Sequence, residues 1–171
     1  AVACLSYGSL ASWLLGFPDQ ARQKRDQSLA HAKSLNHPFS LGFASNFAAY
    51  LDIFLRDSEA AKRHGTRAAE VCEEHGFSLF LAAARINCGW GRVWGSKRAD
   101  GLAELEGGVT SFRDVGAKIF VPFYLASLGE ACLVCGLKDQ ARQALEEAAE
   151  LARDYPEPWW DPEILRLQGD L

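Results

Sequence analysis

Cys132-x2-Cys135 is the one pair of residues with a metal-like or redox-like spacing. Two thiolates at this spacing bind zinc or form a redox couple when a second pair or a thioredoxin-like context accompanies them, and neither is present here. The pair lies in an apolar stretch, residues 128–137, that is predicted to be helical. Free cysteines in such a stretch act as small hydrophobic residues. Core packing is therefore the favoured interpretation, with a metal or redox role as the alternative.

The histidines and carboxylates form no recognisable catalytic set. No histidine pairs with a serine or cysteine in a known catalytic order, and the chain has no phosphate loop, H-E-x-x-H or G-x-S-x-G motif. His37 and His75 lie near the ends of predicted helices, where an imidazolium favours the helix dipole. Asp161 is predicted to complement a helix N-terminus. We therefore expect no enzyme activity in this segment, and no metal or cofactor. The four histidines are His31, His37, His64 and His75.

Composition is that of an ordinary folded domain. The chain has 171 residues, of which 49% are hydrophobic and 23% charged, with a formal net charge of −4. No basic face of the kind that binds nucleic acid is present, and no apolar run is long enough to span a membrane. Five cysteines, an odd number, favour a reducing, cytoplasmic setting. The absence of methionine suggests a segment of a longer protein.

Small residues recur every 40 positions without gaps, which indicates close contacts between helices. Bulky apolar residues recur at the same spacing and are the expected core. One small column is Ser9, Ala49, Gly89, Gly129 and Gly169; a second is Ala21, Ala61, Gly101 and Ala141; a third is Ser28, Ala68, Gly108 and Ala148. The bulky columns are Trp13, Ile53, Val93 and Leu133; Leu14, Phe54, Trp94 and Val134; and Phe39, Leu79, Ile119 and Trp159.

Helix breaks repeat with the same period. Asn36, Gly76 and Gly116, followed by Pro156, mark one break, because asparagine and glycine accept the left-handed conformation after a helix. A second break falls near residues 16–19, 56–58, 95–97 and 136–139, and Pro122 and Pro162 are placed near helix starts. First helices are predicted over about 1–15, 39–55, 78–94 and 119–135, and second helices over about 18–35, 58–75, 98–115 and 138–154, with a fifth first helix from about 162.

The chain is therefore predicted to be an all-α, superhelical array of antiparallel helix pairs, an α-solenoid forming a single domain over 1–171. Its repeats cover approximately 1–37, 38–76, 77–116 and 117–156, with a partial fifth over 157–171. No single repeat can bury its apolar face alone, so neighbouring repeats must cover one another. Such an array leaves a concave surface lined mainly by first helices.

The fourth repeat resembles a tetratricopeptide repeat in Leu125-x2-Leu128-Gly129 and Ala141-x3-Leu145-x2-Ala148, with Pro156 after them. The chain also resembles the tetratricopeptide-like (TPR/MalT-like) region found at the C-terminus of predicted bacterial ATPases linked to class III adenylate/guanylate cyclases. The resemblance lies in the turns at 14–21, 35–41 and 73–77. It is most specific in the ending Trp159-Trp160-Asp161-Pro162-Glu163-Ile164-Leu165-Arg166-Leu167. The 40-residue period departs from the usual 34. The resemblance implies a role in signal transduction for the parent protein, and carries no catalytic residue over to this chain.

The resemblance also implies a concave groove. Its positions map to Phe43, Asn46, Tyr50 and Phe54; to Ala83, Ile86, Trp90, Val93 and Trp94; and to Phe123, Ala126, Glu130 and Val134. Tyr50 and Trp90 share a column and are expected to stack in register. Arg85 and Arg92 project from one side of their helix, and Asp52 shares a column with Arg92. One interpretation is that the aromatic residues fill the interior and Arg92 pairs with Asp52; the other is a groove with aromatic anchors and an arginine that binds a peptide carboxylate.

The leading functional hypothesis is a non-enzymatic scaffold that binds a protein or peptide segment, or other domains of its parent chain, through the first-helix surface. It involves no nucleic acid and no membrane, and oligomers are compatible with it. The alternative is a regulatory domain that senses a small ligand, with Asn46, Arg85, Arg92 and Glu130 as candidate polar groups.

Overall fold

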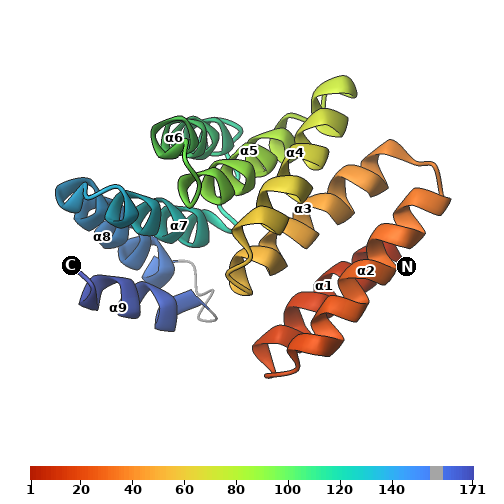
Figure 1. The fold of residues 1–171 in the computed structure, drawn as a ribbon, viewed down its shortest axis with the longest axis horizontal. Helices are drawn as coiled ribbons and strands as arrows, with labels where there is room; N and C mark the ends of the chain where they lie inside the picture. Colours follow the sequence, from red (N-terminus) through yellow and green to blue (C-terminus); the bar gives the residue numbers. More distant parts are fainter. Residues whose placement is uncertain (155–159) are drawn as a thin grey trace.

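The computed structural model describes residues 1–154 and 160–171, which fold into nine α-helices without a strand (Figure 1). The predicted all-α array is confirmed, and the predicted helix ends lie within two residues of those observed. Pro156 and Trp159 lie outside the described residues. The helices are α1 (Val2–Leu14), α2 (Pro18–Ser34), α3 (Pro38–Phe54), α4 (Ser58–Glu74), α5 (Ser78–Val93), α6 (Arg98–Asp114), α7 (Val121–Val134), α8 (Lys138–Asp154) and α9 (Asp161–Gly169).

Each helix packs on the next in sequence, and α1, α3, α5, α7 and α9 also pack in succession on one another. Figure 1 shows the pairs stacked from α1 and α2 at one end of the molecule to α8 and α9 at the other. Left-handed residues end most helices, as the column of asparagine and glycine predicts. They are Gly16, Asn36, Arg56, Gly76, Gly116 and Gly136.

The small-residue columns lie where paired helices touch. A Cβ atom on Gly89 of α5 would lie 2.6 Å from the carbonyl oxygen of Gly101 and from the amide nitrogen of Leu105, both in α6. One on Gly108 would lie 2.8 Å from Ile86 Cγ1. Since real Cβ atoms do not approach backbone this closely, α5 and α6 pack at a distance that only glycine permits.

The inner surface of the array is filled by aromatic side chains rather than open. Tyr50 of α3 and Tyr124 of α7 share a hydrogen bond of 2.5 Å between their hydroxyl groups, although 74 residues separate them. Phe54 of α3 contacts Phe123 of α7 edge to face, with ring centroids 5.6 Å apart. The second and fourth repeats therefore meet across the third, through side chains long enough to bridge the space between them.

The expected pair of Arg92 with Asp52 is wrong. Asp52 is fully buried and binds Arg25 and His64, each at 2.6 Å, while Arg92 binds Glu104 at 2.7 Å. Both His64 and Glu104 lie 12 residues after their partner, on the second helix of the same repeat. Each of the two charges thus has a partner on the second helix of its own repeat, and Asp52 also pairs with Arg25 on α2 of the repeat before it.

The structure agrees with the predictions for Cys132 and His75 but places His37 at the other end of a helix from the one expected. Cys132 is buried, as the core-packing interpretation expects, and Cys135 is partly buried. His75 occupies the C-cap position of α4, as expected for a histidine near a helix end. His37 instead caps the N-terminus of α3, where its Nδ1 accepts a hydrogen bond from the amide of Ser40. Among the helices described, none has the length and apolar character needed to cross a bilayer.

Candidate functional site

Most residues of the predicted groove are buried. Arg85 and Trp94 are exposed, and Phe43, Arg92 and Val134 are partly buried. Tyr50 stacks on Phe120, whereas Trp90 contacts Trp94, so the expected stacking of Tyr50 with Trp90 is not found. The buried members are Asn46, Tyr50, Phe54, Ala83, Ile86, Trp90, Val93, Phe123, Ala126 and Glu130. The structure therefore places these residues in the interior of the array.

A polar chain crosses that interior. Asn46 donates to the carbonyl oxygen of Phe80 at 3.0 Å and accepts from Asn87 Nδ2 at 3.2 Å. The Oδ1 atom of Asn87 is buried and has no hydrogen-bond partner. Burial raises the pKa of Tyr50, although its hydrogen bond to Tyr124 opposes the shift. The hydrogen bonds among these groups link α3 to α5 and to α7, and so restrict how the first helices pack on one another.

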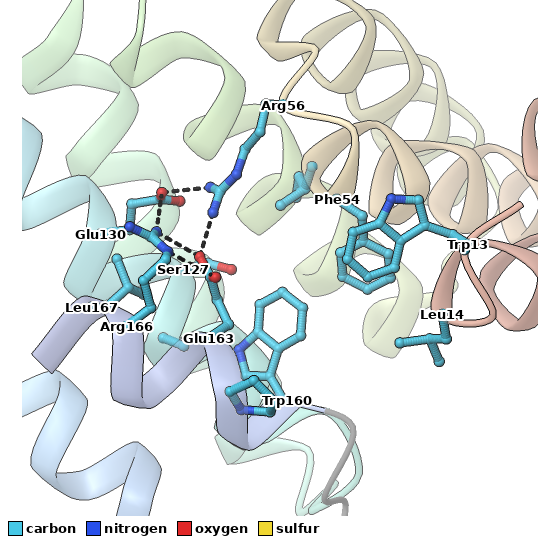
Figure 2. Close-up of a pocket in the computed structure, with 14 residues that line it drawn as sticks. Trp13, Leu14, Phe54, Arg56, Ser127, Glu130, Trp160, Glu163, Arg166 and Leu167 are labelled. Atoms are coloured by element: carbon cyan, nitrogen blue, oxygen red, sulfur yellow. Dashed lines mark hydrogen bonds and ion pairs between the residues drawn. The ribbon is translucent and has the colours of Figure 1, made fainter. Parts of the chain in front are cut away.

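A solvent-accessible cavity lies between the two ends of the array, apart from most of the predicted groove residues. A cavity of about 510 Å³ opens between the C-terminal ends of α1 and α3, the middle of α7, and α9. Figure 2 shows charged side chains on one side of it and Trp13, Leu14 and Phe54 on the other. Its lining residues are Trp13, Leu14, Gly16, Ile53, Phe54, Arg56, Ala126, Ser127, Glu130, Trp160, Pro162, Glu163, Arg166 and Leu167.

The apolar side of the cavity is a group of aromatic rings from three helices. Trp13 stacks on Phe54, with ring centroids 4.8 Å apart and planes at 29°. The ring centroid of Trp160 also lies 5.1 Å from that of Phe54, with the two planes at 37°. Aromatic contacts of this kind add about 0.5–1.5 kcal/mol each beyond the burial of area. The rings thus form a rigid wall that joins the first repeat to α9.

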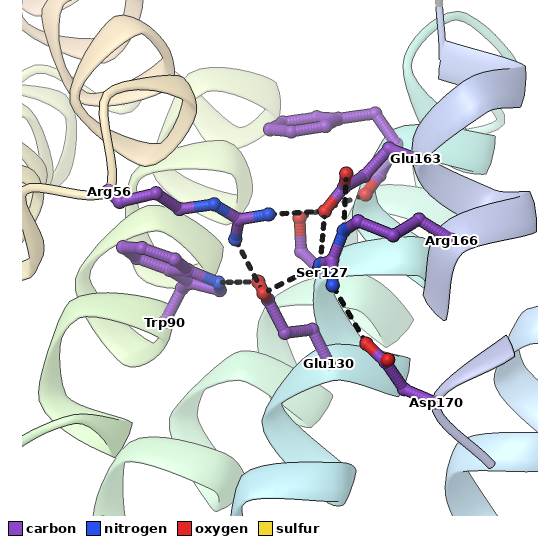
Figure 3. Close-up of polar contacts among 8 residues, drawn as sticks. Arg56, Trp90, Ser127, Glu130, Glu163, Arg166 and Asp170 are labelled. Atoms are coloured by element: carbon purple, nitrogen blue, oxygen red, sulfur yellow. Dashed lines mark hydrogen bonds and ion pairs between the residues drawn. The ribbon is translucent and has the colours of Figure 1, made fainter. Parts of the chain in front are cut away.

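The charged side is a network of ion pairs that joins α3, α7 and α9 (Figure 3). Glu130 accepts from Arg56 Nη1 at 2.5 Å and from the indole nitrogen of Trp90 at 2.9 Å. Glu163 binds both Arg56 and Arg166, the latter at 2.7 Å. The carboxylates are mostly buried, whereas the two arginine side chains are almost half exposed. The network therefore turns its guanidinium groups, rather than its carboxylates, toward solvent.

The arginines control the ionisation of Glu163. Burial favours the neutral form of its carboxyl group, but the hydrogen bonds and positive charges of Arg166 and Arg56 outweigh burial and lower its pKa. The same hydrogen bond to Glu163 raises the pKa of Arg166. Glu163 is thus ionised at neutral pH, and its ion pair with Arg56 draws α9 toward the end of α3.

Arg56 reaches this network from a strained backbone position. Its φ angle is 60°, in the left-handed region that non-glycine residues seldom adopt. The equivalent positions 40 residues before and 80 residues after it are Gly16 and Gly136, which also have positive φ. A side chain at such a place costs of order 1–3 kcal/mol, and strain of this kind concentrates at functional sites.

The serine of the cavity is hydrogen-bonded within its own helix, and two cysteines outside the cavity are buried. Ser127 donates its hydroxyl hydrogen to the carbonyl oxygen of Phe123, one turn earlier on its own helix. Burial raises the pKa of the Cys72 and Cys132 thiols to about 11, which suppresses their reactivity at neutral pH. Over residues 1–154 and 160–171, no three histidine, cysteine or carboxylate side chains converge as a metal site would require.

Sequence reasoning found three of the cavity residues, Phe54, Ala126 and Glu130, and missed Trp13, Arg56, Glu163 and Arg166. The sequence did mark Arg56 as unusual. It is the one large residue at a turn position that the other repeats fill with Gly16, Ser96 and Gly136. No signal indicated that its partners lie 74 and 107 residues away.

Comparison with known proteins gives a distant similarity and no family. No family model matches the chain. An uncharacterized protein of Rhizobium meliloti (strain 1021) is 20% identical over 163 residues, which cover 95% of this chain. The chain spans 16% of the length of that relative. The similarity therefore covers a small part of a much longer bacterial protein, and the name of that protein gives no activity.

Proposed function

We propose that this chain is a non-enzymatic helical-repeat scaffold that holds a segment of another protein, or of another domain of its parent chain, at the cavity between α1, α3, α7 and α9. The observation that carries this proposal is the apolar surface around the mouth of the cavity. Leu14 lines the cavity, and Leu15 and Phe17 follow it in the turn between α1 and α2.

These apolar side chains meet water in the free domain. Leu14 is 47% exposed, and Leu15 and Phe17 are more exposed still. Burying such apolar surface against a partner contributes roughly 25 cal/mol per Å² to the free energy of binding. Because the exposed residues continue the wall of the cavity onto the outer surface, an extended polypeptide with bulky apolar residues fits them. One of its side chains would enter the cavity between Trp13 and Arg56, which both line it.

The proposed setting is a cytoplasmic bacterial signalling protein with ATPase or cyclase domains, in which a tetratricopeptide-like region connects the other parts. The resemblance of the repeat turns and of the ending around Trp160 supports this setting. The small fraction of the Rhizobium relative that the chain covers, 16%, is consistent with one segment among several.

Selection from a random-peptide display library tests the scaffold proposal. The wild-type domain is expected to enrich peptides with bulky apolar residues. Leu14→Glu places a charge on the apolar wall and is expected to abolish enrichment, while the exposure of Leu14 preserves the fold. Leu35→Glu is the matched control, because Leu35 is 50% exposed, lies in the turn between α2 and α3, and does not line the cavity.

The proposal predicts that Leu35→Glu selects the same peptides as the wild-type domain. Failure of the wild-type domain to enrich any peptide would contradict it. Equal enrichment by Leu14→Glu would also contradict it, by placing the interaction away from the cavity. Circular dichroism of each variant shows whether its helices are intact.

The cavity itself favours a second candidate function, the sensing of a small ligand. Its volume of about 510 Å³ falls within the range of roughly 300–1,000 Å³ typical of small-molecule sites. It combines aromatic rings with convergent polar groups, as such sites do. Of the polar groups expected from the sequence, only Glu130 lines it; Asn46 is buried in the core, and Arg85 and Arg92 lie outside the lining.

A further inference from the structure

The charged groups that line the cavity are paired with one another. Its lining includes two arginines, Arg56 and Arg166, and two glutamates, Glu130 and Glu163, which bind one another. Asp170 binds Arg166 from the rim. A ligand with a full negative charge would have to compete with carboxylates already in place, and a cation would face two guanidinium groups. Taking a charge out of water without a free counter-charge is costly, so this lining favours a ligand without net charge.

Hydrogen-bonding capacity nevertheless remains. A guanidinium group has five N–H bonds, and Arg56 uses two of them, one to Glu130 and one to Glu163. The carboxylate oxygens of Glu163 offer lone pairs beyond those that the arginines occupy, since an ionised carboxylate can accept about four hydrogen bonds. The polar wall can thus donate to a ligand and accept from it, close to the same point.

The opposite wall favours a flat ligand. Trp13 and Phe54 are nearly parallel and stacked, and Trp160 packs at 37° to Phe54. Aromatic faces gain most from offset stacking on another flat ring, with centroids roughly 4.5–7 Å apart. An aliphatic ligand of the same volume would gain area burial without this geometry.

From these walls together we infer that the cavity binds a neutral, planar heteroaromatic ring with hydrogen-bond donors and acceptors along its edge, such as a nucleobase or a flavin ring. The ring stacks on Trp13, which is partly exposed and covers the buried Phe54, and its polar edge meets Arg56 and Glu163. This inference rests on the second candidate function, and names the class of ligand that the sensing domain takes.

Titration followed by the indole N–H signals of the tryptophans in a two-dimensional NMR spectrum tests this inference. The probes are adenosine and riboflavin, which present a purine and an isoalloxazine ring. Adenosine monophosphate carries the same purine with a charge, and 3-phenylpropionate is an aromatic acid without a polar ring edge. The signal of Trp13 is expected to shift saturably with adenosine or riboflavin, with a dissociation constant below about 1 mM. Trp94, which lies outside the lining, provides the reference signal.

Two variants test the contributions of the aromatic wall and of the polar wall separately. Trp13→Leu keeps apolar bulk but removes the ring, and Arg56→Gly removes the N–H donors at a backbone position suited to glycine. Each is expected to weaken binding about tenfold, a difference typical of one stacking or hydrogen-bonding interaction. Trp94→Leu is the control for loss of a tryptophan and is expected to bind like the wild-type domain. Thermal denaturation confirms that each variant is folded.

Several results would overturn the inference. One is the absence of any saturable shift of Trp13 with both neutral probes. Another is binding of adenosine monophosphate or 3-phenylpropionate more than tenfold tighter than adenosine, which would show that the site recognises charge. A third is unchanged affinity in both cavity variants. Peptide enrichment together with any of these results leaves the scaffold proposal standing, because the two experiments use different probes.

Discussion

Arg56 shows how one residue ties the ends of this array together. It lies two residues after the end of α3, where a glycine would fit without strain, and its side chain binds Glu130 on α7 and Glu163 on α9. The cost of the left-handed backbone, of order 1–3 kcal/mol, is comparable to what two half-exposed ion pairs return. Stability alone therefore gives little reason for an arginine here, and its position beside the cavity gives a better one.

Acid is expected to loosen α9 through Glu163. In the folded state its pKa lies below the ordinary value of 4.5, because Arg166 and Arg56 outweigh the effect of burial. The unfolded chain therefore binds more protons at low pH, and the stabilisation from Glu163 is present above about pH 4.5 and is lost as the pH falls through the folded-state pKa. Glu163→Gln, which cannot ionise, lacks this contribution at every pH.

Thermal denaturation of the wild-type domain and of Glu163→Gln between pH 7 and pH 3 checks this. At pH 7 the wild-type domain is expected to melt at a higher temperature than Glu163→Gln. The difference between the two melting temperatures is expected to narrow on acidification. Glu70→Gln is the control, because its pair with Arg67 is exposed and contributes little. A gap that stays constant down to pH 3 would show that the ionised Glu163 does not hold α9.

At the scale of the element, spacing between helices depends on glycines at particular faces. Gly107 and Gly108 are neighbours on α6, but a Cβ atom on Gly108 would press on Ile86 and one on Gly107 would meet nothing within 4 Å. Gly108→Ala is therefore expected to destabilise the domain by about 1–3 kcal/mol. Gly107→Ala is expected to stabilise it by roughly 0.5–1 kcal/mol, since alanine restricts the unfolded chain.

Urea denaturation measures both free energies of unfolding, and the adjacent residues serve as controls for each other. Similar effects of the two substitutions would mean that α5 and α6 are not packed at the distance observed.

The helices were predictable because their signals are local. Glycine or asparagine after a helix, proline near its start, and small residues every 40 positions each specify backbone geometry within a few residues. The start of α7 is the least accurate, because Phe120, with a φ angle of 64°, delays it to Val121. The ion pairs of Asp52 and Arg92 were not predictable from columns, since the nearer second helix competes with the neighbouring repeat.

At the scale of the whole molecule, curvature brings α3 against α7 and α9, and the sequence carries no direct signal of it. Each crossing of paired helices adds a small rotation, and only their sum decides which repeats meet. The groove residues mapped from the resemblance, such as Tyr50 and Phe123, became core because the turn of the array closes over them. The cavity remains at the edge of this closure, where residues of α9 and of the end of α1 line the same hollow.

The most direct test of the central claim is to map, by backbone amide NMR, where a library-selected peptide binds this domain. The structure predicts perturbed signals around the cavity, at Leu14, Gly16, Arg56 and Glu163. Perturbation confined to the groove positions Arg85, Arg92 and Trp94, with the cavity signals unmoved, would contradict the account.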